Sequence, residues 1–182
     1  PVINGLDNFE HPCQIMADLL TVKEHLGKLK GVKMAYVGDG NNVCNSLMLG
    51  CAMVGMDLSC GCPKGYEPDP GVLKKAKAIA KKNKCQLKVV ESPKEAAKDA
   101  DVVYTDVWGS MGQEEEQKLR EKIFKPYQVN SDLMSVAHKK AIVMHCLSAH
   151  RGMEITDEVI DSKASVVLDQ AENRLHAQKA IM

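Results

Sequence analysis

A short apolar run that ends in a glycine turn decides the fold: residues 32–42 read VKMAYVGDGNN. The first six residues are apolar enough to form a buried β-strand, and the glycines that follow allow a tight turn. Residues 42–55 then repeat apolar side chains at the spacing of an α-helix. A strand, a glycine turn and a helix in this order predict the first half of a βαβ unit.

The rest of the chain repeats this alternation. Further strands are predicted at residues 56–60, 87–90, 101–105 and 141–144, with a short sixth strand at 165–168. Helices are predicted at residues 11–28, 71–82 and 113–124, with a short helix starting at Ser92 and a last helix from Gln170. Strands separated by helices predict an α/β fold, a doubly wound, Rossmann-like parallel sheet with helices on both faces.

Polar loops follow some of the predicted strands and not others. The first strand leads into residues 38–42, the fourth into residues 106–112 and the fifth into residues 145–152. In an open parallel sheet, ligands bind beyond the carboxyl ends of the strands, where the strand order reverses. We therefore expect the order 3-2-1-4-5, which makes these three strands neighbours and brings their loops together.

The composition argues against several classes of protein. The 182 residues carry 24 Lys and Arg against 24 Asp and Glu, so no excess of positive charge indicates a nucleic-acid binder or a polybasic membrane-surface protein. The longest apolar stretch, residues 47–56, is far shorter than the ~18–20 residues that cross a bilayer. Seven cysteines, an odd count, do not fit the disulfide framework of a secreted domain and predict a reducing, cytoplasmic location.

Spacing argues against two common kinds of site. A dinucleotide-binding turn needs a third glycine where this chain has Val43, and it needs an acidic residue at the end of the second strand, which is missing. Cys60 and Cys62 are one residue apart, whereas zinc knuckles need two to four residues between ligands. Asn41 and Asn42, two neutral amides that open a helix, suit a carboxylate or amide ligand instead.

Two other segments hold candidate reactive groups. Histidine and arginine side chains flank Cys146 within residues 145–151, and such neighbours can lower the pKa of a thiol. The alternative for Cys146 is an inert buried cysteine. His11 opens the predicted helix 11–28, where free N–H groups and the helix dipole favour an anion or an amide, although a lone histidine there is more often structural.

Five short motifs in a fixed order form a specific pattern. They are HPCQ at 11–14, GDGNN at 38–42, DVWGSMG at 106–112, HCL at 145–147 and ENRLHAQ at 172–178. Together they resemble the ornithine-binding domain of the aspartate/ornithine carbamoyltransferase family, and the resemblance covers essentially the whole chain. It implies transfer of the carbamoyl group of carbamoyl phosphate to the side-chain amine of L-ornithine, giving L-citrulline and phosphate, with no metal and no organic cofactor.

The resemblance implies which residues bind the carbamoyl group. His11 and Gln14 hold its oxygen and its amide, and Arg174 assists at the same carbonyl. Negative charge builds on the carbamoyl oxygen during attack, so donors fixed at this place stabilise the transition state.

It also implies which residues bind ornithine. Asn42 binds the amino-acid end, and Asp106, Ser110 and Met111 complete that pocket, with the Asp106 carboxylate facing the α-ammonium group. Cys146 and the carbonyl of Leu147 lie beside the reacting amine and the carbamoyl nitrogen. Cys146, His11 and Arg174 are therefore the expected catalytic residues.

The chain departs from the family pattern at Ser148, where relatives usually have proline after a cis peptide bond. A cis bond costs about 2.5–4 kcal/mol before serine and ~0.5–1 kcal/mol before proline. Either the bond stays cis at Leu147–Ser148, or the loop relaxes to trans and misplaces the Leu147 carbonyl.

The second departure is that no Ser-Thr-Arg-Thr motif, the family's phosphate-binding loop, occurs in this sequence. We expect a piece of a longer protein, in which residues 1–30 bridge to an N-terminal carbamoyl-phosphate domain and residues 31–182 form the ornithine-binding domain, truncated at its C-terminus. We expect this half to be inactive alone and the full-length protein to be a homotrimer. The alternatives are a carbamoyltransferase for another amine, such as putrescine or acylated ornithine, and a non-catalytic amino-acid-binding module.

Overall fold

The computed structural model describes residues 2–109 and 114–182, and its core is a parallel sheet of five strands. The strands are β1 (Lys33–Val37), β2 (Asp57–Gly61), β3 (Leu87–Val90), β4 (Val102–Thr105) and β5 (Ile142–His145). Their order is β3-β2-β1-β4-β5, and every neighbouring pair is parallel. The predicted fold class and the predicted strand order are confirmed.

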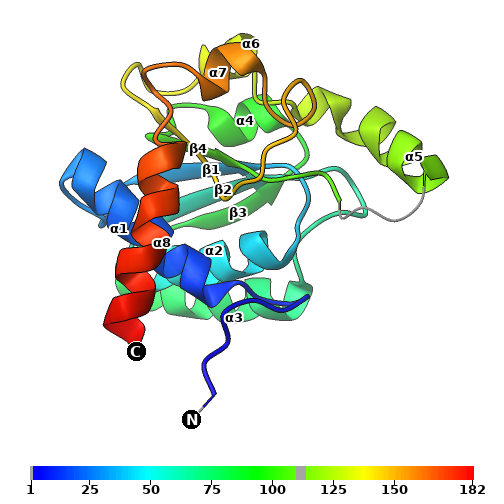
Figure 1. The fold of residues 1–182 in the computed structure, drawn as a ribbon. Helices are drawn as coiled ribbons and strands as arrows, with labels where there is room; N and C mark the ends of the chain where they lie inside the picture. Colours follow the sequence, from blue (N-terminus) through cyan, green and yellow to red (C-terminus); the bar gives the residue numbers. More distant parts are fainter. Residues whose placement is uncertain (1, 110–113) are drawn as a thin grey trace.

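Helices cover both faces of the sheet (Figure 1). One face packs against α1 (Pro12–Leu26), α2 (Asn42–Val54) and α3 (Pro70–Asn83), and the other against α4 (Pro93–Ala97), α6 (Ser131–Met134) and α7 (Asp157–Ile160). Successive strand residues alternate between the two faces, so Met34 and Tyr36 join the first core while Ala35 and Val37 join the second. β4 and β5 are buried at every position, which explains why both are nearly continuous apolar runs.

The first and the last helices of the chain pack against each other. Helix α8 (Val167–Ile181) lies along α1 and also contacts β5. Helix α5 (Glu114–Phe124) projects from the opposite end of the molecule (Figure 1) and leads into the 3₁₀ turn η1 (Lys125–Tyr127). The ends of the chain that carry two of the five sequence motifs, at 11–14 and 172–178, are therefore close in space.

The predicted sixth strand at residues 165–168 is wrong. Ser165 forms a single parallel bridge with Val143, and α8 begins at Val167 rather than at Gln170. The run SVVL is too short to distinguish a strand from the start of a helix. The structure buries Val166 and Val167 but leaves Leu168 77% exposed, so the run does not continue along β5.

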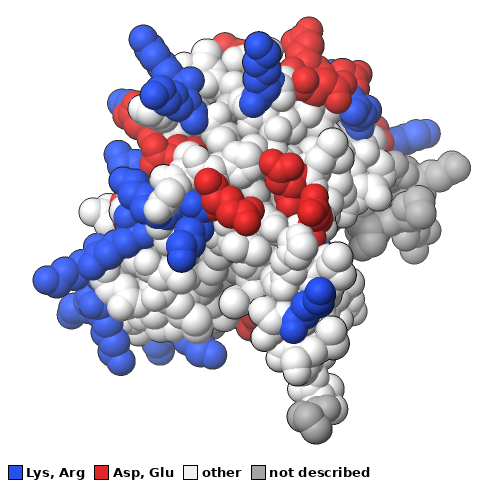
Figure 2. Space-filling model, turned by 60° about the vertical axis from the view of Figure 1, so that its left-hand side comes forward, with Lys and Arg blue, Asp and Glu red and all other residues white. Residues whose placement is uncertain are grey.

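The surface separates charges of opposite sign, although the totals are equal. Figure 2 shows one face, on which Lys and Arg side chains are densest along the left and lower-left edge and Asp and Glu side chains lie across the middle and the top.

Within residues 2–109 and 114–182, no helix is both long and apolar enough to cross a membrane.

The turn after β1 depends on Gly40, because the backbone of residues 66–68 passes directly over it. A Cβ atom on Gly40 would lie 2.2 Å from the Pro68 nitrogen and 2.4 Å from the Glu67 carbonyl carbon. We expect Gly40→Ala to lower the free energy of unfolding by about 3 kcal/mol, since backbone atoms cannot move aside as a flexible side chain can. Chemical denaturation of the two chains measures the difference.

Gly5→Ala is the matched control, because no atom lies within 4 Å of a Cβ built there. Its free energy of unfolding should stay within about 0.5 kcal/mol of the parent chain. Equal stability of the two variants would show that the turn can relax around the added methyl group.

Candidate functional site

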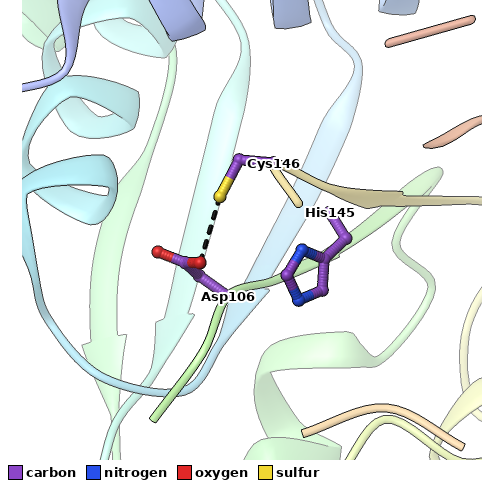
Figure 3. Close-up of side chains that lie close together, drawn as sticks. All are labelled: Asp106, His145 and Cys146. Carbon is purple, nitrogen blue, oxygen red and sulfur yellow. Dashed lines mark hydrogen bonds between the residues drawn. The ribbon is translucent and has the colours of Figure 1, made fainter. Parts of the chain in front are cut away.

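The site forms where β1, β4 and β5 end side by side, and Asp106 is its centre. This buried carboxylate follows β4 and accepts a hydrogen bond from the Cys146 thiol, with Sγ 3.0 Å from Oδ1 (Figure 3). Its other oxygen, Oδ2, accepts from Asn41 Nδ2 at 2.7 Å. The predicted convergence of the three loops is confirmed for the residues that the structure describes.

The Cys146 thiol is held in its protonated form. Burial raises its pKa well above the usual value, and the charge of Asp106 and the hydrogen bond to it raise the pKa further. The expectation that cationic neighbours lower this pKa is wrong. Arg151, the nearest arginine in sequence, pairs instead with Asp157 and Asp161 on the surface.

His145 is not the cationic neighbour that its position in the sequence suggests. Its Nδ1 accepts a hydrogen bond from the Leu147 N–H at 2.9 Å, so that nitrogen carries no proton. Its Nε2 lies 3.0 Å from Glu154 Oε1 and therefore donates. The ring is a neutral imidazole, and like Glu154 it is fully buried.

The two hydrogen bonds of the His145 ring decide whether this residue can also bind a metal ion. One ligand atom each from Asp106, His145 and Cys146 lies within 4.8 Å of the others, which is close enough for a shared cation. However, neither nitrogen of His145 has a free lone pair, because one donates to Glu154 and the other accepts from Leu147. The arrangement therefore supplies two ligands rather than three.

Leu147 has an unusual backbone. Its φ is +59°, and the peptide bond between Leu147 and Ser148 is cis. Of the two alternatives left open for Ser148 by the sequence, the structure has the cis one. The hydrogen bond from the Leu147 N–H to His145 holds this turn against the end of β5.

A second group of candidate residues joins α1 to α8. Arg174 Nη1 donates to Gln14 Oε1 at 2.6 Å, although the two residues are 160 positions apart in the sequence. Gln14 is 1% exposed, and its Nε2 donates to Asp18 Oδ1 at 2.8 Å. The amide of Gln14 is therefore fixed at both ends, with its oxygen toward Arg174.

His11 opens α1 beside this group. Burial lowers the pKa of its ring, and the charge of Arg174 lowers it further, so the ring is neutral at pH 7. Nδ1 lies 3.0 Å from the Gly5 carbonyl oxygen, which can only accept, and so the proton sits on Nδ1. To donate to a carbamoyl oxygen from Nε2, His11 has to take up a proton or release Gly5.

Asp18 is a buried carboxyl group that sequence reasoning missed. It is 0% exposed and accepts from Gln14 Nε2 and Gln170 Nε2, both at 2.8 Å, and from the Tyr104 hydroxyl at 3.0 Å. Burial raises its pKa to about 7, and the three hydrogen bonds oppose that rise. Its position inside the apolar run of α1, four residues after Gln14, is the sequence pattern that could have revealed it.

The structure places the remaining predicted residues as follows. Asn42 Nδ2 donates to the Asp7 carbonyl at 2.7 Å rather than to a residue of the site. Its neighbour Asn41, which caps α2, is the amide that contacts Asp106. Ser110 and Met111 lie outside the described residues.

The raised pKa of the Cys146 thiol can be tested by alkylation. Among the seven cysteines, which all lie in the described ranges, Cys146 is the one that is not buried. Asp106→Asn removes the negative charge that helps to keep the proton on sulfur, so the pH of half-maximal iodoacetamide labelling should fall. The labelling rate at pH 8 should rise roughly tenfold for each unit of pKa lost.

Asp169→Asn, a change at an exposed carboxylate on α8, is the control and should leave the labelling rate unchanged. Mass spectrometry of the peptide that contains residue 146 gives the rate. An unchanged or slower rate in Asp106→Asn would contradict the proposed electrostatic cause.

Comparison with known proteins identifies the family. Residues 30–182 match the family model described as aspartate/ornithine carbamoyltransferase, Asp/Orn binding domain. The whole chain is 58% identical to an ornithine carbamoyltransferase of Methanobrevibacter smithii and 57% identical to one of Archaeoglobus fulgidus, and it spans 60% and 58% of their lengths. The chain therefore covers less than two thirds of these relatives.

Solved structures agree. The ornithine carbamoyltransferase of Pyrococcus furiosus superimposes with a TM-score of 0.97 at 56% identity, covering 100% of this chain and 58% of that one. The enzyme of Gloeobacter violaceus gives a TM-score of 0.93 at 51% identity, covering 100% of this chain and 60% of that one. The order of the motifs, the sheet and these matches agree, and the chain belongs to the aspartate/ornithine carbamoyltransferase family.

Proposed function

We propose that the full-length protein transfers the carbamoyl group of carbamoyl phosphate to the side-chain amine of L-ornithine. The products are L-citrulline and phosphate. The observation that carries this proposal is the pairing of the Asp106 carboxylate with the Cys146 thiol at the end of β4 and β5, on a chain 58% identical to a named ornithine carbamoyltransferase. This chain supplies the half that binds the amine.

Asp106 and Cys146 suit a substrate with two amino groups. The carboxylate gives a cationic amine an acceptor, and all of its present partners are neutral donors. The attacking amine has to be neutral. A protonated thiol beside it is a weak nucleophile and does not compete with the amine, and it can donate or accept a hydrogen bond. The amine nitrogen then attacks the carbamoyl carbon, the bond from that carbon to the phosphate oxygen breaks, and the departing phosphate takes up the proton that the amine loses.

Gln14 and Arg174 suit the carbamoyl group. Negative charge develops on the carbamoyl oxygen during attack, and the guanidinium of Arg174 is a fixed source of positive charge for it. The Gln14 oxygen has a second lone pair for an N–H of the carbamoyl amide. His11 is the third group that faces the carbamoyl group. Its protonation state in the complex depends on whether the bound carbamoyl oxygen accepts a hydrogen bond from Nε2.

The same proposal covers the parts of the protein beyond this chain. Residues 1–30 bridge to an N-terminal domain that binds the phosphate of carbamoyl phosphate, and residues 31–182 form the ornithine-binding domain. The full-length protein is a homotrimer in the cytoplasm. The support is the family membership, the length of the relatives and the free thiols of all seven cysteines.

The proposal predicts which protein and which amine react. The purified full-length protein should form citrulline from carbamoyl phosphate and ornithine, and it should be far slower with putrescine or acetylornithine, which lack one of the charged groups. The 182-residue chain alone should give no measurable product, because it has no match to the phosphate-binding motif. A colorimetric ureido assay with each amine measures the rates.

If putrescine or acetylornithine reacts faster than ornithine, that amine is the substrate instead. Ornithine binding by calorimetry without any turnover in the full-length protein would favour the non-catalytic amino-acid-binding module. Citrulline formation by the 182-residue chain would contradict the division of labour between the two domains.

A carboxylate that binds an ammonium group should matter most for ornithine. We expect Asp106→Asn to lower kcat/KM for ornithine by roughly 100-fold, the loss of one charge-assisted hydrogen bond of about 2.7 kcal/mol. The KM for carbamoyl phosphate should change little. An equal rise of both KM values would instead indicate general damage to the site.

A further inference from the structure

The buried carboxyl group of Asp18 has no place in the proposed chemistry, yet it lies between the two halves of the site. It is on α1, and its three hydrogen-bond donors come from α1, β4 and α8. No cation contacts it directly in the described residues, since Arg174 acts on it only through charge. A buried carboxylate held by neutral donors alone is costly, because it loses its hydration without gaining an ion pair.

One branch of this network leads to the carbamoyl side. Asp18 Oδ1 accepts a hydrogen bond from Gln14 Nε2, so the Gln14 oxygen points away from Asp18. That oxygen accepts from Arg174 Nη1 at 2.6 Å. Asp18 therefore determines which end of Gln14 faces the guanidinium, and without it the amide could turn over and present N–H groups to Arg174.

The other branch leads to the amine side. The same Oδ1 accepts a hydrogen bond from Gln170 Nε2, so that the Gln170 oxygen faces the end of β5. There it accepts from the backbone N–H of His145 at 2.9 Å. His145 is the residue before Cys146, and its ring holds the N–H of Leu147.

We propose that Asp18 is a positioning residue, which orients the amides of Gln14 and Gln170 and thereby aligns Arg174 with the turn that carries Cys146. This inference rests on the proposed function for its effect on catalysis. Asp18 itself is two hydrogen bonds from Arg174 and two from the backbone of His145, and it reaches neither substrate.

The network works with an ionised Asp18. Both of its oxygens then accept, and the two glutamines and Tyr104 supply the three donors. Both glutamines bond to Oδ1, so a side chain that keeps one acceptor at this position can still hold them.

The kinetic test uses the full-length protein and two substitutions. Asp18→Leu keeps the forked shape of the side chain but removes both acceptors, and we expect kcat to fall on the order of 100-fold, as when reacting groups are misplaced by about 1 Å. Asp18→Asn can still accept from both glutamines at Oδ1, so most of the activity should return.

Val22→Ala is the matched control. Val22 lies one turn further along α1 and is equally buried, but its side chain has no polar atom that could bond to Gln14 or Gln170. The change should lower stability while leaving kcat unchanged. A kcat for Asp18→Leu within threefold of the parent, or a kcat for Asp18→Asn as low as that of Asp18→Leu, would overturn the proposal.

A second measurement does not depend on activity. The side-chain amide protons of Gln14 and Gln170 should exchange slowly with solvent by NMR in the parent and in Asp18→Asn, and more than tenfold faster in Asp18→Leu. If Asp18→Leu does not fold, the exchange rates in the parent and in Asp18→Asn decide, and fast exchange of both amides in the parent would overturn the proposal. If the parent forms no citrulline, the proposed function fails, and equal amide exchange in all variants would then overturn the orienting role as well.

Discussion

The hydrogen bonds that pair β1 with β4, and β4 with β5, bring three segments of chain to one edge of the sheet, and the site depends on that adjacency. Parallel strands all end at the same edge, so the turn after β1, Asp106 and Cys146 have to meet there. β1 also marks the reversal of strand order, since the chain runs outward through β2 and β3 before it returns to β4. In sheets of this kind, ligands bind in the crevice at such a reversal, because the connections on its two sides leave in opposite directions.

Asp106 and Asp18, two of the buried carboxyl groups near the site, are satisfied by neutral donors. Asp106 accepts from an amide, a thiol and a backbone N–H, and Asp18 accepts from two amides and a phenol. A carboxylate that already has an arginine partner would have little charge left for a cationic substrate. At Asp106 the charge remains available, and the same charge keeps the proton on Cys146. One electrostatic arrangement thus favours an ammonium ligand and disfavours a thiolate nucleophile.

Sequence reasoning predicts most of the fold but only part of the site. Short β-type runs that alternate with helical segments identify all five strands, and the distribution of polar loops identifies their order. The short run at 165–168 was misassigned because four apolar residues fit either a strand or a helix start, and only its packing decides. Neighbours in sequence were also a poor guide to charge, since the ring of His145 is neutral and bonds to Glu154, nine residues away.

The choice between Asn41 and Asn42 illustrates the same limit. Both open α2, and a motif alone does not say which amide points toward the crevice. The position of each residue in the helix decides which amide contacts Asp106. Asn41 is the N-cap residue, and its side chain turns back over the first turn of α2. There its oxygen accepts from the Cys44 N–H and its nitrogen donates to Asp106. Asn42, the first helical residue, points toward Asp7 instead.

The polar character of the contact between α1 and α8 explains how residues 160 positions apart can share a site. Apolar helix faces tolerate a slide along each other, but this contact pairs Asp18 with Gln170 and Thr21 with Asn173. A slide by one turn, about 5.4 Å, would leave these groups buried without partners, at about 1–3 kcal/mol for each. Only one register satisfies them all, and in that register Arg174 lies opposite Gln14. The buried polar groups therefore align the two ends of the chain. This explains why a costly carboxyl group is kept on the buried face of α1, between Gln14 and Thr21.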